Sequence, residues 1–315
     1  FERAELSQFR DRVKRSCAKR ASASLPTQMP STSLKPTEFA HESEAEFANL
    51  LDFYQIEWLY EPRSFPLAWN GDGVSLMFTP DFYLPELDMY IELTTMKQEL
   101  ITQKNRKVRK LREMYPDINI RLLTRKDFSR LLSKYGYGPQ GEAKVEGVGR
   151  VLYSQTQIRR RVRSLARKIS RDYAGQRIVM IGVLKGVMCF MSDLMQNISI
   201  PVSVDYMDIS HYGGDGAIVK ITRDLDAPIA GEHVLMVEDI VDTGMTLNYV
   251  LAHLASHKPA TLRVCTLLDR TPRRLANVRL DYVGFEIPDE FVVGYGLDYK
   301  EEYRNLPFIG ILKQD

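Results

Sequence analysis

Residues 234–247 of the chain read VLMVEDIVDTGMTL, and this stretch decides the fold of the half of the chain around it. Its four opening apolar residues are typical of a strand buried inside a parallel sheet. After the loop, apolar residues recur at the spacing of one helical face: Leu247, Val250, Leu251 and Leu254. The pattern predicts a buried strand, a polar loop and an amphipathic helix.

The loop of this unit has the chemistry of an anion site. Gly244 lets the backbone approach a ligand closely, and Thr243 and Thr246 offer hydroxyl groups. Together with the free N–H groups at the helix start, these residues suit a phosphate. Glu238 and Asp239, at the strand end, suit sugar hydroxyls or Mg2+. The alternative is an ordinary strand-to-helix turn with solvated acids.

The run from Glu238 to Thr246 resembles the phosphoribosyl-pyrophosphate (PRPP) signature of the type I phosphoribosyltransferases. Strands and helices alternate from about residue 150, which predicts a parallel sheet with its ligand beyond the carboxyl ends of the strands. The stretch from about 150 to 313 resembles the hypoxanthine-guanine phosphoribosyltransferase family in four further motifs, at 183–186, 204–213, 266–270 and 285–299. The resemblance implies an α/β fold of type I phosphoribosyltransferase kind, a parallel sheet flanked by helices with a small hood.

The same resemblance implies a role for each matching residue. Asp242 would handle the proton at purine N7, and Glu238, Asp239 and Asp298 would hold Mg2+. The residues implied to bind PRPP are Lys185, Gly186, Glu238, Asp239, Thr243, Gly244, Met245, Thr246 and Arg304. The purine would contact Arg270, Phe291 and Val292, and the flexible lid would carry Ser210 and Tyr212. The Leu184–Lys185 peptide would be cis.

The chain departs from the family pattern at three places. Arg270 stands where the family usually has Lys, and Arg donates through a planar fork rather than a point charge. His211 replaces the usual Ser before the lid Tyr212, and the segment that follows, up to Val219, is a few residues short. The sequence therefore leaves open the preference among hypoxanthine, guanine and xanthine. Arg270 has a simpler alternative as a surface charge, and His211 as an exposed lid residue.

The N-terminal half, residues 37–135, resembles the core of the PD-(D/E)xK nuclease superfamily, a restriction-endonuclease-like α/β domain. Asp81 and Glu92 match the two strand acids, and a helical acid, Glu46 or Glu44, would join them. Such carboxylates hold a divalent ion, which activates water. Thr94 occupies the expected Lys position, so Lys97 is the candidate lysine. Three interpretations remain: acids that only cap turns, an inert nuclease-like fold that binds a partner, or an active nuclease.

A basic helix predicted over 103–115 follows this candidate site and suggests DNA or RNA as a partner through phosphate contacts. The alternative is a solvated helix face.

The remaining sequence features concern the number of domains, the location and the partners of the whole protein. Its 315 residues favour two domains, and a formal net charge of +2 favours no partner. We expect a basic Ser/Pro-rich tail without fixed structure (1–36), the nuclease-like domain (37–135), a Gly-rich linker (136–149) and the transferase domain (150–315). No signal peptide or membrane-spanning run is expected. The three cysteines fit a cytoplasmic protein.

The sequence thus predicts a Mg2+-dependent 6-oxopurine phosphoribosyltransferase, which makes IMP or GMP from PRPP and free base in purine salvage. The family resemblance implies a homodimer or homotetramer. The alternative is a nucleic-acid-processing protein with an active N-terminal nuclease, whose transferase half senses or supplies nucleotides.

Overall fold

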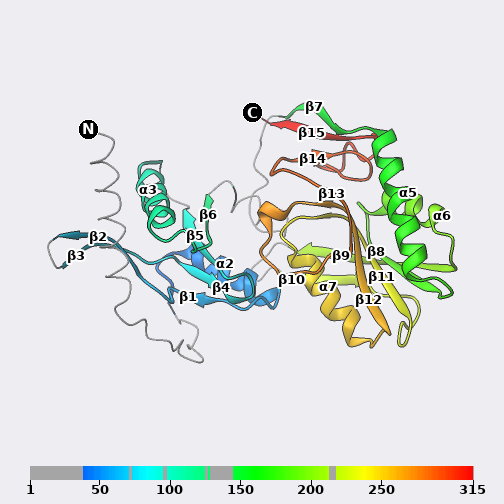
Figure 1. Ribbon diagram of the computed structural model, residues 1–315, viewed down its shortest axis with the longest axis horizontal. Coiled ribbons are helices and arrows are strands. Elements are labelled where there is room, and N and C mark those ends of the chain that lie inside the picture. Colours follow the sequence, from blue (N-terminus) through cyan, green and yellow to red (C-terminus); the bar gives the residue numbers. More distant parts are fainter. Residues whose placement is uncertain are drawn as a thin grey trace, which may run out of the picture. The chain divides into compact units, whose positions relative to one another are not determined.

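The computed structural model describes residues 38–70, 73–94, 98–124, 127, 145–212 and 218–314 (Figure 1). The predicted tail and Lys97 lie outside the described residues, as does most of the predicted linker. Among the helices that the structure describes, none combines the length and the apolar character needed to cross a membrane.

The C-terminal half is built on a six-stranded sheet with the strand order β10-β9-β8-β11-β12-β13. Five strands run parallel, and β10 pairs with β9 antiparallel. The strands are β8 (Ile178–Val183), β9 (Val202–Tyr212), β10 (Ile218–Arg223), β11 (His233–Val241), β12 (Thr261–Asp269) and β13 (Tyr282–Glu286). Strand β9 continues to Tyr212, so it contains the predicted lid residues Ser210 and Tyr212.

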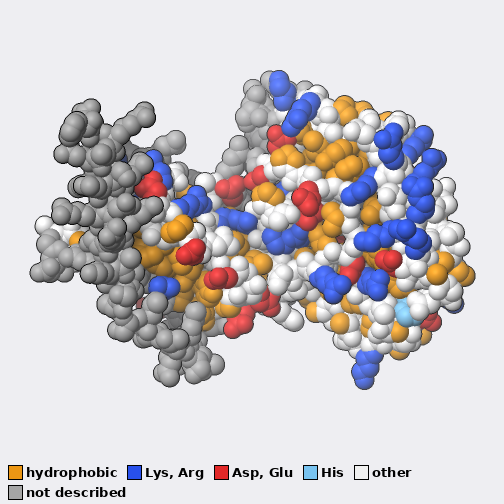
Figure 2. Space-filling model, in the orientation of Figure 1, with side chains coloured by type: hydrophobic (Ala, Val, Ile, Leu, Met, Phe, Trp, Pro, Cys, Tyr) orange, Lys and Arg blue, Asp and Glu red, His pale blue; other side chains and the backbone are white. Residues whose placement is uncertain are grey.

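Helices cover both faces of this sheet, as the alternation along β11 shows. Leu235 and Val237 pack in one apolar cluster with α5 (Gln155–Asp172) and α6 (Met188–Asn197). Val234 and Met236 pack in the other with α7 (Met245–Ser256). Burial on both faces is why this strand reads as an unbroken apolar run. On the opposite face of α5, Arg160, Arg163 and Arg167 are exposed. Figure 2 shows Lys and Arg side chains gathered on this side of the transferase half.

A three-stranded antiparallel sheet, in the order β14-β15-β7, forms the hood. Its strands are β7 (Val145–Tyr153), β14 (Val292–Val293) and β15 (Ile309–Gln314). The prediction of a linker up to residue 149 is wrong for its last five residues, since β7 begins at Val145. The glycines that suggested a linker are tolerated because β7 lies at the sheet edge with an irregular register, and Gly147 has φ +109°.

The N-terminal half contains a four-stranded sheet in the order β1-β4-β5-β6. The strands are β1 (Leu59–Tyr60), β4 (Phe82–Leu84), β5 (Met89–Thr94) and β6 (Ile120–Thr124), and β2 (Phe65–Asn70) pairs with β3 (Gly73–Phe78) as a separate hairpin. The helices are α2 (Glu42–Phe53) and α3 (Gln98–Met114), with a short 3-10 turn at Pro85–Leu87. The predicted basic helix therefore begins five residues earlier than the sequence suggested.

Strand β5 is buried along its whole length between these two helices. Ile91 and Leu93 join the apolar cluster that contains α2, whereas Tyr90 joins the cluster that contains Val108 and Leu111 of α3. Because side chains alternate along a strand, Glu92 shares the α3 face with Tyr90. This alternation decides which helix can reach Glu92.

Candidate active site

The predicted transferase residues come directly after neighbouring strands of the six-stranded sheet. Lys185 follows β8, Asp242 follows β11, and Arg270 follows β12. These strands are adjacent and parallel in the order β8-β11-β12. Their carboxyl ends therefore meet at one edge, which is where ligands bind in open α/β sheets.

The phosphate loop depends on Gly244, the N-cap of α7, whose backbone is left-handed (φ +81°, ψ −8°). A Cβ at this position would lie 3.1 Å from each of Ala276 O, Arg274 Cδ and Val278 Cγ2. Two backbone hydrogen bonds anchor the loop: Thr243 O accepts from the N–H groups of Leu275 (2.8 Å) and Ala276 (3.1 Å). The first-turn N–H groups of α7 are thereby presented at the sheet edge, as an anion site requires.

The acidic pair at the end of β11 meets the loop that follows β8. Glu238 is buried and pairs in register with Thr266 of β12. Asp239 is half-buried and accepts the backbone N–H of Ile240 at 2.7 Å. A Cβ on Gly186 would overlap with the carboxylate of Asp239, so any larger residue there would force that carboxylate to move. The Leu184–Lys185 peptide is cis, as the sequence resemblance implied.

Four charged side chains form a cluster beside this loop. Lys185 Nζ lies 3.2 Å from Glu301 Oε2, and Arg304 Nη2 lies 2.9 Å from Asp298 Oδ1. The backbone N–H of Glu301 donates to Asp298 Oδ2 at 2.9 Å, which joins the two ion pairs. The hydrogen bond from Lys185 and the charge of Arg304 hold the pKa of Glu301 below its usual range. Glu301 was missed in the sequence, although its place between Asp298 and Arg304 was an available signal.

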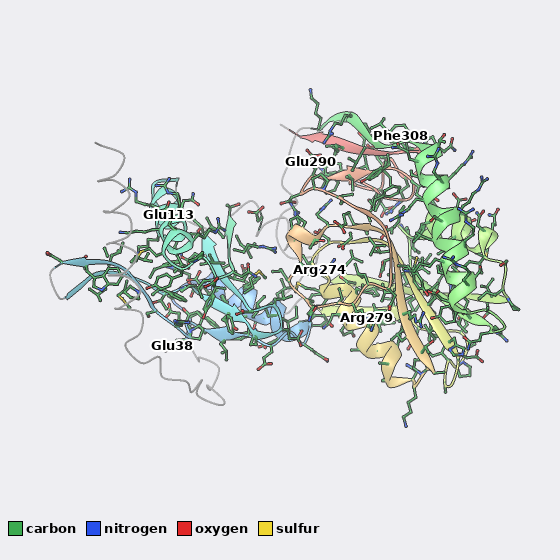
Figure 3. All side chains as sticks on the ribbon, in the orientation of Figure 1. Glu38, Glu113, Arg274, Arg279, Glu290 and Phe308 are labelled. Atoms are coloured by element: carbon green, nitrogen blue, oxygen red, sulfur yellow. The ribbon has the colours of Figure 1, made fainter. Side chains whose placement is uncertain are left out.

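Arg270 is buried rather than a surface charge, which excludes its simpler alternative. Its Nη1 lies 3.5 Å from Asp242 Oδ2, and its Nη2 donates to the carbonyl of Glu290 at 2.6 Å. Glu290, labelled in Figure 3, lies in the loop after β13. The planar guanidinium therefore bridges the loops after β11 and β13, which a single ammonium is less suited to do. The sequence did not point to this role of the Glu290 carbonyl.

The remaining predicted purine and lid residues lie on the hood and on β9. Phe291 is half-buried, with its ring 5.7 Å from that of Tyr299 in a T-shaped arrangement. Val292 is buried and pairs with Ile311 of β15. Ser210 and Tyr212 belong to β9, in the part that pairs with β10, and their side chains lie outside the described part of the structure.

The donor set fits the Mg2+ that the family resemblance implies. Glu238, Asp239 and Asp298 offer carboxylate oxygens, which hard cations prefer. Asp239 lies against Gly186, next to Lys185, and Lys185 is linked to Asp298 through Glu301. Acids and cations thus alternate in the region that would receive a pyrophosphate.

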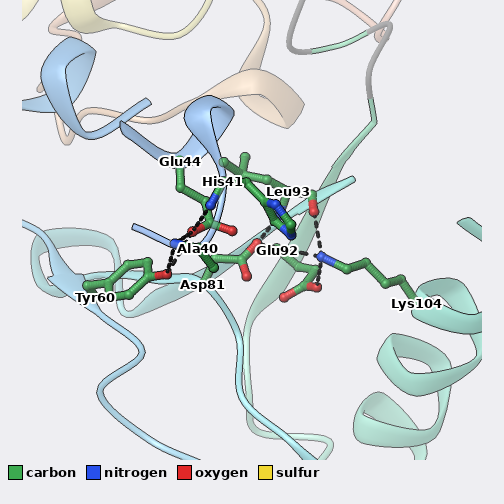
Figure 4. A network of polar contacts seen from close by, with 8 residues as sticks. All are labelled: Ala40, His41, Glu44, Tyr60, Asp81, Glu92, Leu93 and Lys104. Carbon is green, nitrogen blue, oxygen red and sulfur yellow. Dashed lines mark hydrogen bonds and ion pairs between the residues drawn. The ribbon is translucent and has the colours of Figure 1, made fainter. Parts of the chain in front are cut away.

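A second cluster of charged residues lies in the N-terminal half (Figure 4). Asp81 immediately precedes β4, Glu92 lies on β5, and both are buried. Lys104 of α3 reaches them: its Nζ lies 2.6 Å from Glu92 Oε1 and 4.0 Å from Asp81 Oδ2. Lys104 Nζ also donates to the Leu93 carbonyl at 2.8 Å.

The helical acid of this cluster is Glu44. It is buried, and its Oε2 accepts from the hydroxyl of Tyr60 at 2.7 Å and from the N–H of Ala40 at 3.1 Å. Figure 4 draws Glu44 in the same polar network as Asp81, and Glu44 is buried whereas Glu46 is only half-buried. Of the two helical acids that the sequence offered, Glu44 is therefore the one in this cluster.

Burial changes the titration of these carboxyl groups. Desolvation, with a smaller effect of Glu92, raises the pKa of Asp81 to about 7, and desolvation also raises the pKa of Glu92. Burial lowers the pKa of the Lys104 ammonium, but Asp81 and Glu92 together raise it further, above its usual value. Perturbed groups of this kind cluster at functional sites more often than elsewhere.

Two side-chain oxygens on one face of β5 are also unsatisfied. In the described part of the chain, Glu92 Oε2 and Thr94 Oγ1 are buried with no hydrogen-bond partner. Unsatisfied buried oxygens carry a cost, and a cation or its water would satisfy them. Sequence reasoning missed Lys104, although the basic helix predicted over 103–115 contained it.

Comparisons with known proteins identify the C-terminal half. The phosphoribosyl transferase domain model matches residues 151–300. The hypoxanthine-guanine phosphoribosyltransferase of Bacillus subtilis is 43% identical over 169 residues, which are 53% of this chain and 94% of that protein. A crystal structure of a hypoxanthine-guanine phosphoribosyltransferase from Bacillus anthracis is 44% identical with a TM-score of 0.51, and covers 54% of this chain and 100% of that chain.

A fused relative is also similar. The bifunctional protein TilS/HprT of Listeria monocytogenes is 43% identical over 172 residues, and this chain spans 26% of its length.

The C-terminal half has the type I phosphoribosyltransferase fold. Through that half, the chain belongs to the hypoxanthine-guanine phosphoribosyltransferase family and has hypoxanthine phosphoribosyltransferase activity.

Proposed function

We propose that the C-terminal half is a Mg2+-dependent 6-oxopurine phosphoribosyltransferase that converts PRPP and hypoxanthine or guanine into IMP or GMP and pyrophosphate. One observation carries the proposal: Lys185, Asp242 and Arg270 follow adjacent parallel strands around the phosphate loop at Gly244. Side chains suited to pyrophosphate, base and 5-phosphate therefore follow strands that end at one sheet edge, which supports the proposal.

The roles follow from charge and position. The N–H groups of the α7 start and the hydroxyls of Thr243 and Thr246 hold the 5-phosphate. Lys185 and Arg304 stabilise the charge that develops on the leaving pyrophosphate. Bound Mg2+, held by Glu238, Asp239 and Asp298, would supply further charge compensation there.

Asp242, Arg270 and Phe291 act on the purine base. Asp242 takes or gives the proton at purine N7 as the glycosidic bond forms or breaks. Arg270 holds Asp242 in place and donates toward the 6-oxygen, while Phe291 stacks on the ring. The lid strand with Ser210 and Tyr212 excludes water, since hydrolysis of PRPP is the competing reaction.

The test is the Asp242→Asn substitution in steady-state kinetics. We expect kcat to fall by a factor of about 100 or more, in the range of lost general acid–base catalysis, with the KM for PRPP little changed. Asp226→Asn, which removes a carboxylate exposed on the loop after β10, is the matched control. Near-normal turnover in Asp242→Asn would remove Asp242 from this role.

A second function, a metal-dependent nuclease in the N-terminal half, is favoured by the cluster of Glu44, Asp81, Glu92 and Lys104. The carboxylates suit a divalent ion, which would activate water at this site. Lys104 comes from α3 and takes the place that the sequence assigned to Lys97. Its ammonium is positioned to stabilise charge on a scissile phosphate.

The test is incubation of the full chain with plasmid or single-stranded DNA in Mg2+ or Mn2+. We expect cleavage that is lost in the Asp81→Ala, Glu92→Ala double variant and in Lys104→Ala. It should persist in Lys110→Ala, which removes another lysine from the same helix. Absence of cleavage with either metal would leave an N-terminal half that binds a partner or supports assembly.

The assembly and location of the protein remain predictions. A homodimer or homotetramer, as the family resemblance suggested, would be tested by analytical ultracentrifugation of the full chain. A cytoplasmic location would be tested by fractionation of the host cell.

A further inference from the structure

A histidine and carboxylate cluster lies on the transferase half, outside the site described above. Asp224 directly follows β10, and His253 and His257 lie at the end of α7. One ligand atom from each of the three side chains lies within 4.8 Å of the other two. His253 Nε2 is 3.0 Å from both carboxylate oxygens of Asp224, and the two imidazole rings are 4.9 Å apart between centroids.

The helix explains why the two histidines point the same way. Residues four apart on a helix are neighbours on one face, so a ligand pair at this spacing can share an ion. His257 Nδ1 lies 3.0 Å from the carbonyl of His253. A carbonyl can only accept, so Nδ1 carries the proton in the neutral ring and Nε2 keeps its lone pair for a metal.

Asp224 is oriented by its own surroundings. Its Oδ1 accepts the backbone N–H of Leu225 at 2.8 Å, which fixes the carboxylate toward His253. Metal ligands are commonly held by such additional hydrogen bonds. The three donors therefore come from two separate elements, and one donor atom of each lies within 4.8 Å of the other two.

We propose that Asp224, His253 and His257 bind one Zn2+ ion. Two imidazole nitrogens and one carboxylate oxygen are a donor set for Zn2+, with a water completing the tetrahedron. Mg2+ and Ca2+ prefer oxygen donors and are not expected to compete here. The site is chemically distinct from the carboxylate sites described above.

The position of this site gives the ion a mechanical role. Asp224 ends the hairpin of β9 and β10, whose first strand carries the lid residue Tyr212. Helix α7 begins at Gly244 in the phosphate loop and ends at the two histidines. Bound Zn2+ ties the base of the lid hairpin to the helix that presents the 5-phosphate site. The ion therefore stabilises this half of the chain without contacting substrate.

The experiment is a Zn2+ titration of the full chain, freed of metal with EDTA and dialysed, in excess Mg2+ that saturates oxygen-donor sites. A chromophoric zinc indicator reports competition, and thermal unfolding is followed in parallel. We expect one Zn2+ bound per chain in competition with the indicator, and a rise in the melting temperature on its addition. His257→Asn and Asp224→Asn should each weaken binding by about tenfold or more and abolish the rise.

Two variants separate this site from a simple ion pair. His257→Asn keeps the contact between Asp224 and His253. If that contact were only a structural ion pair, the variant and the wild type would show the same Zn2+ binding and the same melting temperature. His41→Asn removes an imidazole on the N-terminal half and should bind Zn2+ as the wild type does. Equal binding by His257→Asn and the wild type, or no binding by the wild type, would overturn the proposal.

Discussion

Replacement of Gly244 by Ala tests how the phosphate loop is built. The backbone there is left-handed at φ +81°, which costs an L-residue about 1–2 kcal/mol. The added methyl would also lie 3.1 Å from one backbone oxygen and two side-chain carbons. Such crowding costs a further ~1–3 kcal/mol when neighbours must move. We therefore expect the free energy of unfolding to fall by about 2–5 kcal/mol in Gly244→Ala.

The matched control is Gly231→Ala. Gly231 has nearly the same φ, +75°, but a Cβ there would meet nothing within 4 Å. This variant carries the backbone cost alone, about 1–2 kcal/mol. The difference between the two variants isolates the crowding around Gly244.

Urea denaturation measures both stabilities, and steady-state kinetics measures the KM for PRPP. Because small displacements of positioning groups are costly, we expect KM for PRPP to rise about tenfold or more in Gly244→Ala and to stay unchanged in Gly231→Ala. Equal losses of stability and equal KM values in the two variants would show that the contacts of Gly244 do not shape the loop.

Three further predictions concern Arg270, Gly186 and Asp81. Arg270→Lys removes the planar guanidinium that bridges Asp242 and the Glu290 carbonyl. A charge-assisted hydrogen bond contributes about 1.5–3 kcal/mol, so the KM for hypoxanthine should rise about tenfold or more. An unchanged KM would contradict this role. Gly186→Ala forces its methyl into the Asp239 carboxylate, so calorimetry should show PRPP binding lost while the circular dichroism spectrum of the fold is kept. In EDTA, the free energy of unfolding should fall as pH rises from about 4 to 7, because folded Asp81, with a pKa of about 7, keeps a proton that an unfolded Asp releases near pH 4. Urea titrations should show a steeper fall in the wild type than in Asp81→Asn, where buried Glu92, whose pKa is also raised, still contributes; the same slope in both would show that Asp81 is not a source of the fall.

The buried pair of Arg270 and Asp242 shows the limit of reading residue types alone. The sequence identified both positions through contiguous motifs, yet allowed Arg270 to be a surface charge. Burial depends on the Glu290 loop, which joins Arg270 only when β12 and β13 pair side by side. Chain segments that are distant in sequence decided the environment of a residue whose identity was already clear.

In the N-terminal cluster, too, some residues could be identified from the sequence and others only from the structure. Asp81 and Glu92 were found because each sits in a short local pattern, and their strands pair antiparallel. Lys104 is twelve residues beyond Glu92 and reaches it because Val108 and Leu111 of α3 pack on that face of the sheet. The choice between Glu44 and Glu46 was likewise fixed by which side of α2 is buried.

The sequence by itself determined the PRPP loop, the alternation of strands and helices, and the transferase family, because these reside in contiguous residues with strong local periodicity. Tertiary structure decided which lysine meets Glu92, that Gly-rich residues 145–149 form an edge strand, and that Asp224 meets the α7 histidines. Each of these depends on side chains that folding brings together from separate elements, and no local spacing encodes such a meeting.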